Sequence, residues 1–138
     1  MTTDVYTDGA CLGNPGPGGW AFVVDEGLWS SGYESHTTNQ RMELTAASAA
    51  VQAVEGPLRI HSDSTYVVNC FVQGWWKGWI KRGWLNSKKE AVANRDLWEP
   101  FIELVNARGD VEFIWVKGHA GHRLNAVSYT HLTLPTKA

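Results

Sequence analysis

The order of the apolar segments limits how this chain can fold more than any other feature. Three β-type segments come first, at about 4–10, 19–25 and 28–35, and glycine-rich turns join them. Consecutive strands of this kind favour an antiparallel meander. The following segments alternate between types: a helix from the caps at Thr37-Thr38-Asn39 to Gly56-Pro57, a strand at 58–62, a helix from Asp63-Ser64 to about Val72, a helix at about 95–107 and a strand at 111–116.

Alternating strands and helices add parallel pairing, so the pattern predicts an α/β fold with a mixed sheet. Pro100 falls within the helix at 95–107 and leaves open whether that helix is kinked or starts late. The chain has 138 residues, which suits one domain. Its composition, 43% hydrophobic and 19% charged with 12 Lys+Arg against 14 Asp+Glu, excludes a disordered chain and a uniformly basic surface.

The sequence gives no sign of export or membrane insertion. No apolar run approaches the ~18 residues of a membrane span, and Met1-Thr2-Thr3-Asp4 does not begin a signal peptide. We therefore expect a cytoplasmic protein without a membrane partner. Cys11 and Cys70 are too few for a disulfide scaffold or zinc site, and we expect both to be reduced packing residues.

Three acidic residues lie where an ordinary surface charge is unusual. Asp8 and Asp63 are each predicted to end an apolar strand, and Glu43 lies between apolar residues near a helix start. Ligands collect at the carboxyl ends of parallel strands, so the three could share one crevice. Clustered carboxylates repel one another unless a cation is present, and their hard oxygens select Mg²⁺ or Mn²⁺. The alternative is that the aspartates cap loops and Glu43 is solvated.

Four motifs in order resemble the cellular, bacterial-type type-1 ribonuclease H family: YTDGACLGNPGPGGW, TTNQRMELTAA, IHSDSTYVV and WVKGHAGH. The resemblance runs from about Asp4 to Asn125. It implies a mixed five-stranded sheet flanked by helices. It also implies hydrolysis of the RNA strand of RNA–DNA hybrids that leaves 3′-hydroxyl and 5′-phosphate ends. A transposase or integrase relative is disfavoured by the Trp-rich segment and the GHAGH loop.

The resemblance also assigns roles to single residues. Asp8, Glu43 and Asp63 match the first three metal ligands, and Asp8 matches the residue that bridges two Mg²⁺ ions, for which Mn²⁺ is a possible substitute. His119 matches a loop histidine that moves protons or assists product release. Its structural alternative is a hydrogen-bonded surface histidine.

The segment WWKGWIKRGWLNSKK, residues 75–89, is basic, rich in tryptophan and free of acidic residues. Phosphate contacts and aromatic packing on sugars or bases suit nucleic-acid binding, and the family uses this segment to grip the DNA strand. A Trp-rich helix packed into the core is the alternative, and Trp76 competes with Trp75 for one aromatic position. The substrate-binding residues predicted from the resemblance are Cys11, Gly13, Asn14, Thr38, Asn39, Gln40, Trp75, Trp79, Lys81, Arg82, Trp84, Lys88, Lys89 and Asn94. Of these, Asn14, Asn39 and Gln40 match readers of the hybrid's minor groove, and Thr38 and Asn94 match a phosphate pocket.

The chain departs from the family pattern near its end. The fourth metal ligand of the family is an Asp ten residues after the loop histidine, and this chain has Tyr129 there. We divide the chain into a ribonuclease H domain at 1–126 and an atypical tail at 127–138, with the family's final helix missing or altered. Either the tail is non-native or the protein is a natural variant with three carboxylates. The functional alternatives are accordingly a monomeric ribonuclease and a catalytically impaired module that binds RNA–DNA hybrids.

Overall fold

The computed structural model describes residues 2–25 and 28–117. Its strands form one five-stranded sheet, and they span β1 Thr3–Cys11, β2 Gly16–Asp25, β3 Leu28–Thr37, β4 Leu58–Ser62 and β5 Val111–Trp115. The strand order is β3-β2-β1-β4-β5. β1, β2 and β3 pair in antiparallel fashion, whereas β4 is parallel to both β1 and β5. The predicted meander with added parallel strands is confirmed.

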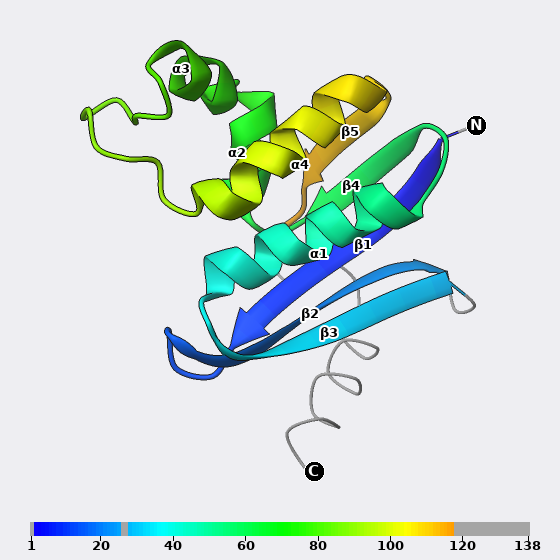
Figure 1. The fold of residues 1–138 in the computed structure, drawn as a ribbon. Helices are drawn as coiled ribbons and strands as arrows, with labels where there is room; N and C mark the ends of the chain where they lie inside the picture. Colours follow the sequence, from blue (N-terminus) through cyan, green and yellow to red (C-terminus); the bar gives the residue numbers. More distant parts are fainter. Residues whose placement is uncertain (1, 26–27, 118–138) are drawn as a thin grey trace.

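Four helices complete the described fold: α1 Asn39–Ala53, α2 Thr65–Val72, α3 Trp75–Lys81 and α4 Arg95–Arg108. α1 and α4 lie over one face of the sheet, and α3 with the loop after it projects from the body of the molecule (Figure 1). The main core lies between the sheet and the helices, where Trp98, Phe101, Leu44 and Ile60 are at most 1% exposed. Within the described residues, no helix has the length and apolar character needed to cross a membrane.

The predicted start of α1 is confirmed in atomic detail. Thr38 is the N-cap, and its hydroxyl accepts a hydrogen bond from Arg41 N at 3.2 Å. The helix ends at Ala53, three residues before Gly56, where the backbone has a φ of 80° that glycine adopts without strain. Pro100 lies inside α4, which begins at Arg95 as one continuous helix. α4 is therefore a helix that tolerates Pro100, and it does not start late.

The expected end of the first strand is wrong. We predicted that Asp8 ends the strand within the segment at about 4–10, but β1 continues through Cys11 and Gly9 pairs with Trp20 of β2. Gly9 is needed for packing: a β-carbon there would lie 2.3 Å from the Met42 carbonyl carbon and 2.5 Å from Glu43 N. The missing side chain lets the first turns of α1 rest directly on β1.

Candidate active site

The parallel pairing of β1 and β4 brings two of the three predicted carboxylates into line. Tyr6 of β1 is the partner of His61 of β4 in the parallel register. Asp8 and Asp63 each lie two residues beyond this pair, Asp8 still within β1 and Asp63 directly after β4. The two side chains therefore project from neighbouring positions at the same end of the sheet.

Glu43 reaches this end of the sheet from α1. Because Gly9 has no side chain, the backbone at Met42 and Glu43 lies against β1, next to Asp8. The loop that carries Asp63 is fixed by two serines: Ser64 N donates to Ser62 Oγ at 3.1 Å, and Ser64 Oγ caps α2 by accepting from Val67 N at 3.2 Å. Each carboxylate thus comes from a separate element whose local backbone is fixed by packing or hydrogen bonds.

Electrostatics show that the three carboxylates interact. The pKa of Glu43 is raised from 4.5 to about 7, mainly by burial and also by the negative charges of Asp63 and Asp8, against a hydrogen bond with Ser64 that lowers it. Gly9 N donates to Asp8 Oδ1 at 2.9 Å, which fixes one oxygen of that carboxylate. A raised carboxyl pKa between two other acids is typical of a site that gains stability from a bound cation.

The donor chemistry of these residues fits a hard divalent cation, since all three supply carboxylate oxygens. In the described part of the chain, however, no group of three or more His, Cys, Asp and Glu side chains is arranged to hold a metal ion. The three carboxylates are thus close enough to alter the pKa of Glu43, but without a cation they do not form a ready-made ligand cage.

A second polar cluster joins the β1–β2 turn to the start of α1. Cys11 N donates to Asn39 Oδ1 at 2.8 Å, and Asn39 N donates to Asn14 Oδ1 at 3.1 Å. The Cys11 thiol donates to Gly13 O at 2.9 Å and is half-buried, so the expectation of a packing cysteine holds for buried Cys70 and not for Cys11. Four residues predicted to bind substrate therefore form one network, and exposed Gln40 follows it in α1.

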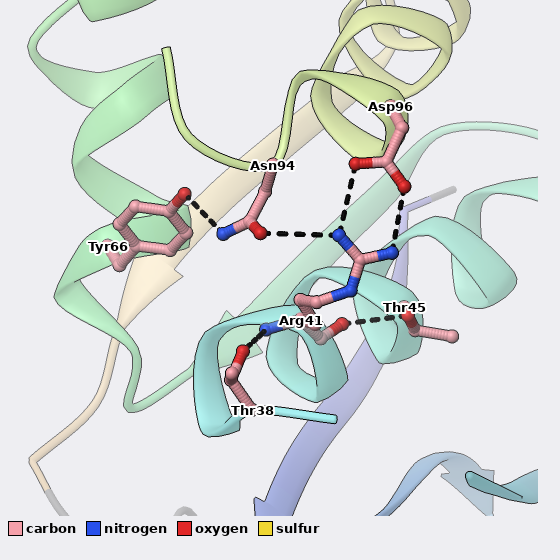
Figure 2. Close-up of polar contacts among 6 residues, drawn as sticks. All are labelled: Thr38, Arg41, Thr45, Tyr66, Asn94 and Asp96. Carbon is pink, nitrogen blue, oxygen red and sulfur yellow. Dashed lines mark hydrogen bonds and ion pairs between the residues drawn. The ribbon is translucent and has the colours of Figure 1, made fainter. Parts of the chain in front are cut away.

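The predicted phosphate-pocket residues Thr38 and Asn94 are linked through Arg41, as Figure 2 shows. Arg41 N donates to Thr38 Oγ1, and Arg41 Nη1 donates to Asn94 Oδ1 at 3.2 Å. Both terminal nitrogens of Arg41 also bind Asp96, at 3.0 and 2.8 Å, and this guanidinium lowers the pKa of Asp96. Asn94 Nδ2 donates to Tyr66 Oη at 3.1 Å. The starts of α1 and α4 are thus tied together at this pocket.

Residues 75–89, which include α3 and part of the loop after it, are called the projecting segment below. The tryptophans of the projecting segment divide between core and surface. Trp79 is only 9% exposed and packs edge-on against buried Trp98, with the two ring centroids 5.4 Å apart. Little of the Trp79 ring therefore remains available to a substrate. Trp75 is 36% exposed and Trp84 is half-buried. The centroids of their rings lie 6.5 and 6.4 Å, respectively, from the centroid of the Trp79 ring. The core alternative therefore describes Trp79, whereas Trp75 and Trp84 retain accessible surface.

The basic residues predicted to bind nucleic acid are all exposed: Lys81, Arg82, Lys88 and Lys89. Arg82 lies over Gly78, where a β-carbon would come within 2.9 Å of its Nη1, and its Nε donates to Leu85 O at 3.1 Å. Trp76, the alternative to Trp75, is half-buried and lies under Lys77, whose Nζ is 5.6 Å from the ring centroid. These contacts leave a positively charged surface on the projecting segment.

Sequence reasoning missed two residues that build the site. Arg41 stands inside the TTNQRMELTAA motif, three residues after its cap Thr38, and that spacing was an available signal. The packing role of Gly9 was not predicted, because the sequence does not reveal the approach of α1. His119, Tyr129 and the tail at 127–138 lie outside the described residues, and the predictions made for them stay predictions.

The fold and the acidic end of the sheet define an α/β protein with the ribonuclease H-like architecture. The family model described as RNase H matches residues 2–128. The ribonuclease H of Moorella thermoacetica is 51% identical over 126 residues, which cover 88% of this chain and 82% of that protein. The ribonuclease H of Syntrophomonas wolfei is 49% identical over 127 residues, which cover 88% of this chain and 86% of that protein.

A solved structure agrees with these sequence matches. The crystal structure of LC9-RNase H1, described as a type 1 RNase H with the type 2 active-site motif, superposes with a TM-score of 0.73 at 30% identity, covering 96% of this chain and 71% of that one. The chain belongs to the ribonuclease H family. The predicted family and fold are confirmed, and membership implies an enzyme that depends on a divalent metal.

Proposed function

We propose that this protein hydrolyses the RNA strand of RNA–DNA hybrids by a two-metal mechanism, leaving 3′-hydroxyl and 5′-phosphate ends. The observation that carries the proposal is the meeting of Asp8, Glu43 and Asp63 at one end of the sheet, with the pKa of Glu43 raised to about 7. Family membership supports the same reaction. The cytoplasmic location and monomeric state expected from the sequence stay predictions.

Asp8, Glu43 and Asp63 would hold two Mg²⁺ ions, for which Mn²⁺ is a possible substitute. When bound, such ions activate the attacking water and stabilise the leaving oxygen of the phosphodiester. The chain's contribution is positioning. The hydrogen bond from Gly9 N orients Asp8, and the serine-capped loop before α2 holds Asp63. A cation would also offset the burial and the charge repulsion that raise the pKa of Glu43 to about 7.

The substrate would lie across two preformed polar clusters. The network of Cys11, Asn14 and Asn39, with Gly13 and Gln40 next to it, presents donors and acceptors suited to the 2′-hydroxyls of an RNA strand. Thr38 and Asn94 form the pocket for a DNA-strand phosphate. The exposed cations of the projecting segment, with Trp75 and Trp84, extend the contact with the backbone of that strand.

One observation favours the second candidate, a module that binds hybrids but turns over poorly. Tyr129 stands where the family has its fourth carboxylate, and a neutral phenol is a weak Mg²⁺ ligand. In this case the chain would retain its affinity for hybrids and lose most of its rate. Replacing the tail by an amphipathic helix with Asp at position 129 would then raise the rate.

The test is cleavage of an RNA–DNA hybrid, an RNA duplex and a DNA duplex side by side in Mg²⁺. We expect cleavage of the hybrid alone, and Asp8→Asn should lower it by at least about 100-fold while hybrid binding remains measurable. Asp4→Asn is the matched control, because Asp4 lies on the same strand but pairs with Arg59 and His61. Full turnover by Asp8→Asn would refute the site, and binding without cleavage by the unaltered chain would favour the second candidate.

A further inference from the structure

Arg95 lies between the phosphate pocket and the projecting segment. It is the first residue of α4 and directly follows Asn94 of the pocket. Its guanidinium carbon is 5.0 Å from the centroid of the Trp84 ring, which belongs to the projecting segment. A cation over the face of an indole ring is attracted by the ring's electron density. Arg95 therefore connects two predicted binding regions, and neither assignment includes it.

The Trp84 ring that supports Arg95 is held in a fixed position. Trp84 has a φ of 66°, a left-handed conformation that is unusual for a bulky side chain. Its backbone N donates to Trp79 O at 2.6 Å, and its carbonyl accepts from Val92 N at 3.1 Å. A residue in such a conformation persists only where its surroundings determine it. The tryptophan surface under Arg95 is thus built before any ligand arrives.

The charge of Arg95 remains accessible. Its side chain is 52% exposed, and its Nε donates to Glu99 Oε1 at 2.8 Å. Within the part of the chain that the structure describes, its two terminal nitrogens make no hydrogen bond. A guanidinium can present those donors to phosphate while its plane rests on an aromatic ring. Glu99 thus fixes the direction of the guanidinium and leaves the outer donors available.

Arg41, which also lies at the phosphate pocket, differs from Arg95 in the availability of its terminal nitrogens. Both terminal nitrogens of Arg41 bind Asp96, which commits their donors inside the protein, whereas Glu99 binds only Nε of Arg95. Arg41 therefore positions Asn94 and has few donors left for a ligand. Beside Asn94, Arg95 combines a positive charge with accessible donors, which a phosphate oxygen requires.

We propose that Arg95 binds a backbone phosphate of the DNA strand on its path from the Asn94 pocket to the projecting segment. The inference rests on the proposed function, since it takes the RNA–DNA hybrid as the ligand. The inference adds Arg95 to the proposed hybrid-binding surface and makes Trp84 the side chain that orients the Arg95 guanidinium.

The experiment measures the affinity of the full chain for a short labelled RNA–DNA hybrid over a series of salt concentrations, in EDTA to prevent cleavage. We expect Arg95→Ala to bind about 5- to 10-fold more weakly and to lower the slope of log K against log salt by about 0.9. Arg95→Lys keeps the charge and should retain the slope with intermediate affinity. Glu99→Gln removes the ion pair but keeps Arg95, and it should leave the slope unchanged and the affinity equal or higher.

The outcomes separate this inference from the proposed function. If the unaltered chain binds the hybrid and Arg95→Ala has the same slope, Arg95 contacts no phosphate and only the inference fails. If Arg95→Ala and Glu99→Gln weaken binding equally and lower the melting temperature together, Arg95 has a structural role and the inference also fails. If the unaltered chain does not bind the hybrid at all, the proposed function fails with it.

Discussion

Glu43 shows how a single buried acid couples stability to metal binding. Its pKa is about 7 in the fold against 4.5 for an ordinary glutamate, so between these values the folded chain binds more protons than the unfolded chain. The stability that protonated Glu43 contributes is complete below pH about 4.5 and is lost as the pH rises through about 7. Without metal, the ionised site therefore destabilises the protein at alkaline pH.

Replacing Glu43 by Gln removes this pH dependence, because the amide stays neutral. The full shift corresponds to about 3 kcal/mol, and solvent screening of the partly exposed carboxyl reduces it to about 1–2 kcal/mol. We expect Glu43→Gln to exceed the unaltered chain in unfolding free energy by that amount at pH 8 and to equal it at pH 4. Denaturant unfolding in EDTA at both pH values measures the difference. Equal stabilities at pH 8 would contradict the raised pKa.

Thr37 contains a buried hydroxyl whose cost can be measured. The residue is 5% exposed at the end of β3, and its Oγ1 makes no hydrogen bond within the described structure. Burying an unpaired hydroxyl costs roughly 1–3 kcal/mol, so Thr37→Val should stabilise the chain by about 1 kcal/mol. Thr45→Val is the control, because the Thr45 hydroxyl donates to Arg41 O at 2.7 Å. Thermal unfolding should show a gain for the first variant and no gain for the second.

The contact between β1 and α1 determines where Glu43 stands. A methyl group at Gly9 would meet the backbone of Met42 and Glu43, which cannot rotate away as a side chain can. We expect Gly9→Ala to cost about 2–4 kcal/mol of stability and to lower cleavage, because α1 must move away from Asp8. Gly56→Ala is the matched control: its φ of 80° strains alanine, but nothing lies within 4 Å, so about 1 kcal/mol is lost and cleavage is kept.

The same contact explains what could be predicted from the sequence and what could not. Local signals were sufficient for α1, because Thr38 caps it and Gly56-Pro57 follows it. The packing role of Gly9 could not be predicted, because a glycine that opens a turn and a glycine that admits a helix look alike in sequence. Likewise, only packing against Trp98 distinguishes Trp79 from Trp75, and that contact joins residues distant in the chain. The sequence was sufficient to predict that the three carboxylates share one end of the sheet. The contacts that hold the site in place could be identified only from the fold.

The whole chain has a net charge of −2, although its proposed ligand is a polyanion. The distribution of charge resolves this conflict, since the projecting segment holds exposed cations and residues 75–89 contain no acid. Phosphate contacts depend on local charge because solvent ions screen charges more than about 10 Å away. The segment also stands apart from the sheet that carries Asp8 (Figure 1).

Replacing Lys81, Arg82, Lys88 and Lys89 together by Ala tests this arrangement. We expect weaker hybrid binding and a salt slope lower by up to about 0.9 log units for each phosphate that the variant no longer binds. Arg59→Ala is the control, since it removes a positive charge from β4, where Arg59 already pairs with Asp4 and Glu112. Its slope should match that of the unaltered chain. If the fourfold variant keeps the full slope while it remains folded, the hybrid binds elsewhere, because a polyanion bound by four fewer cations must release fewer counterions on association.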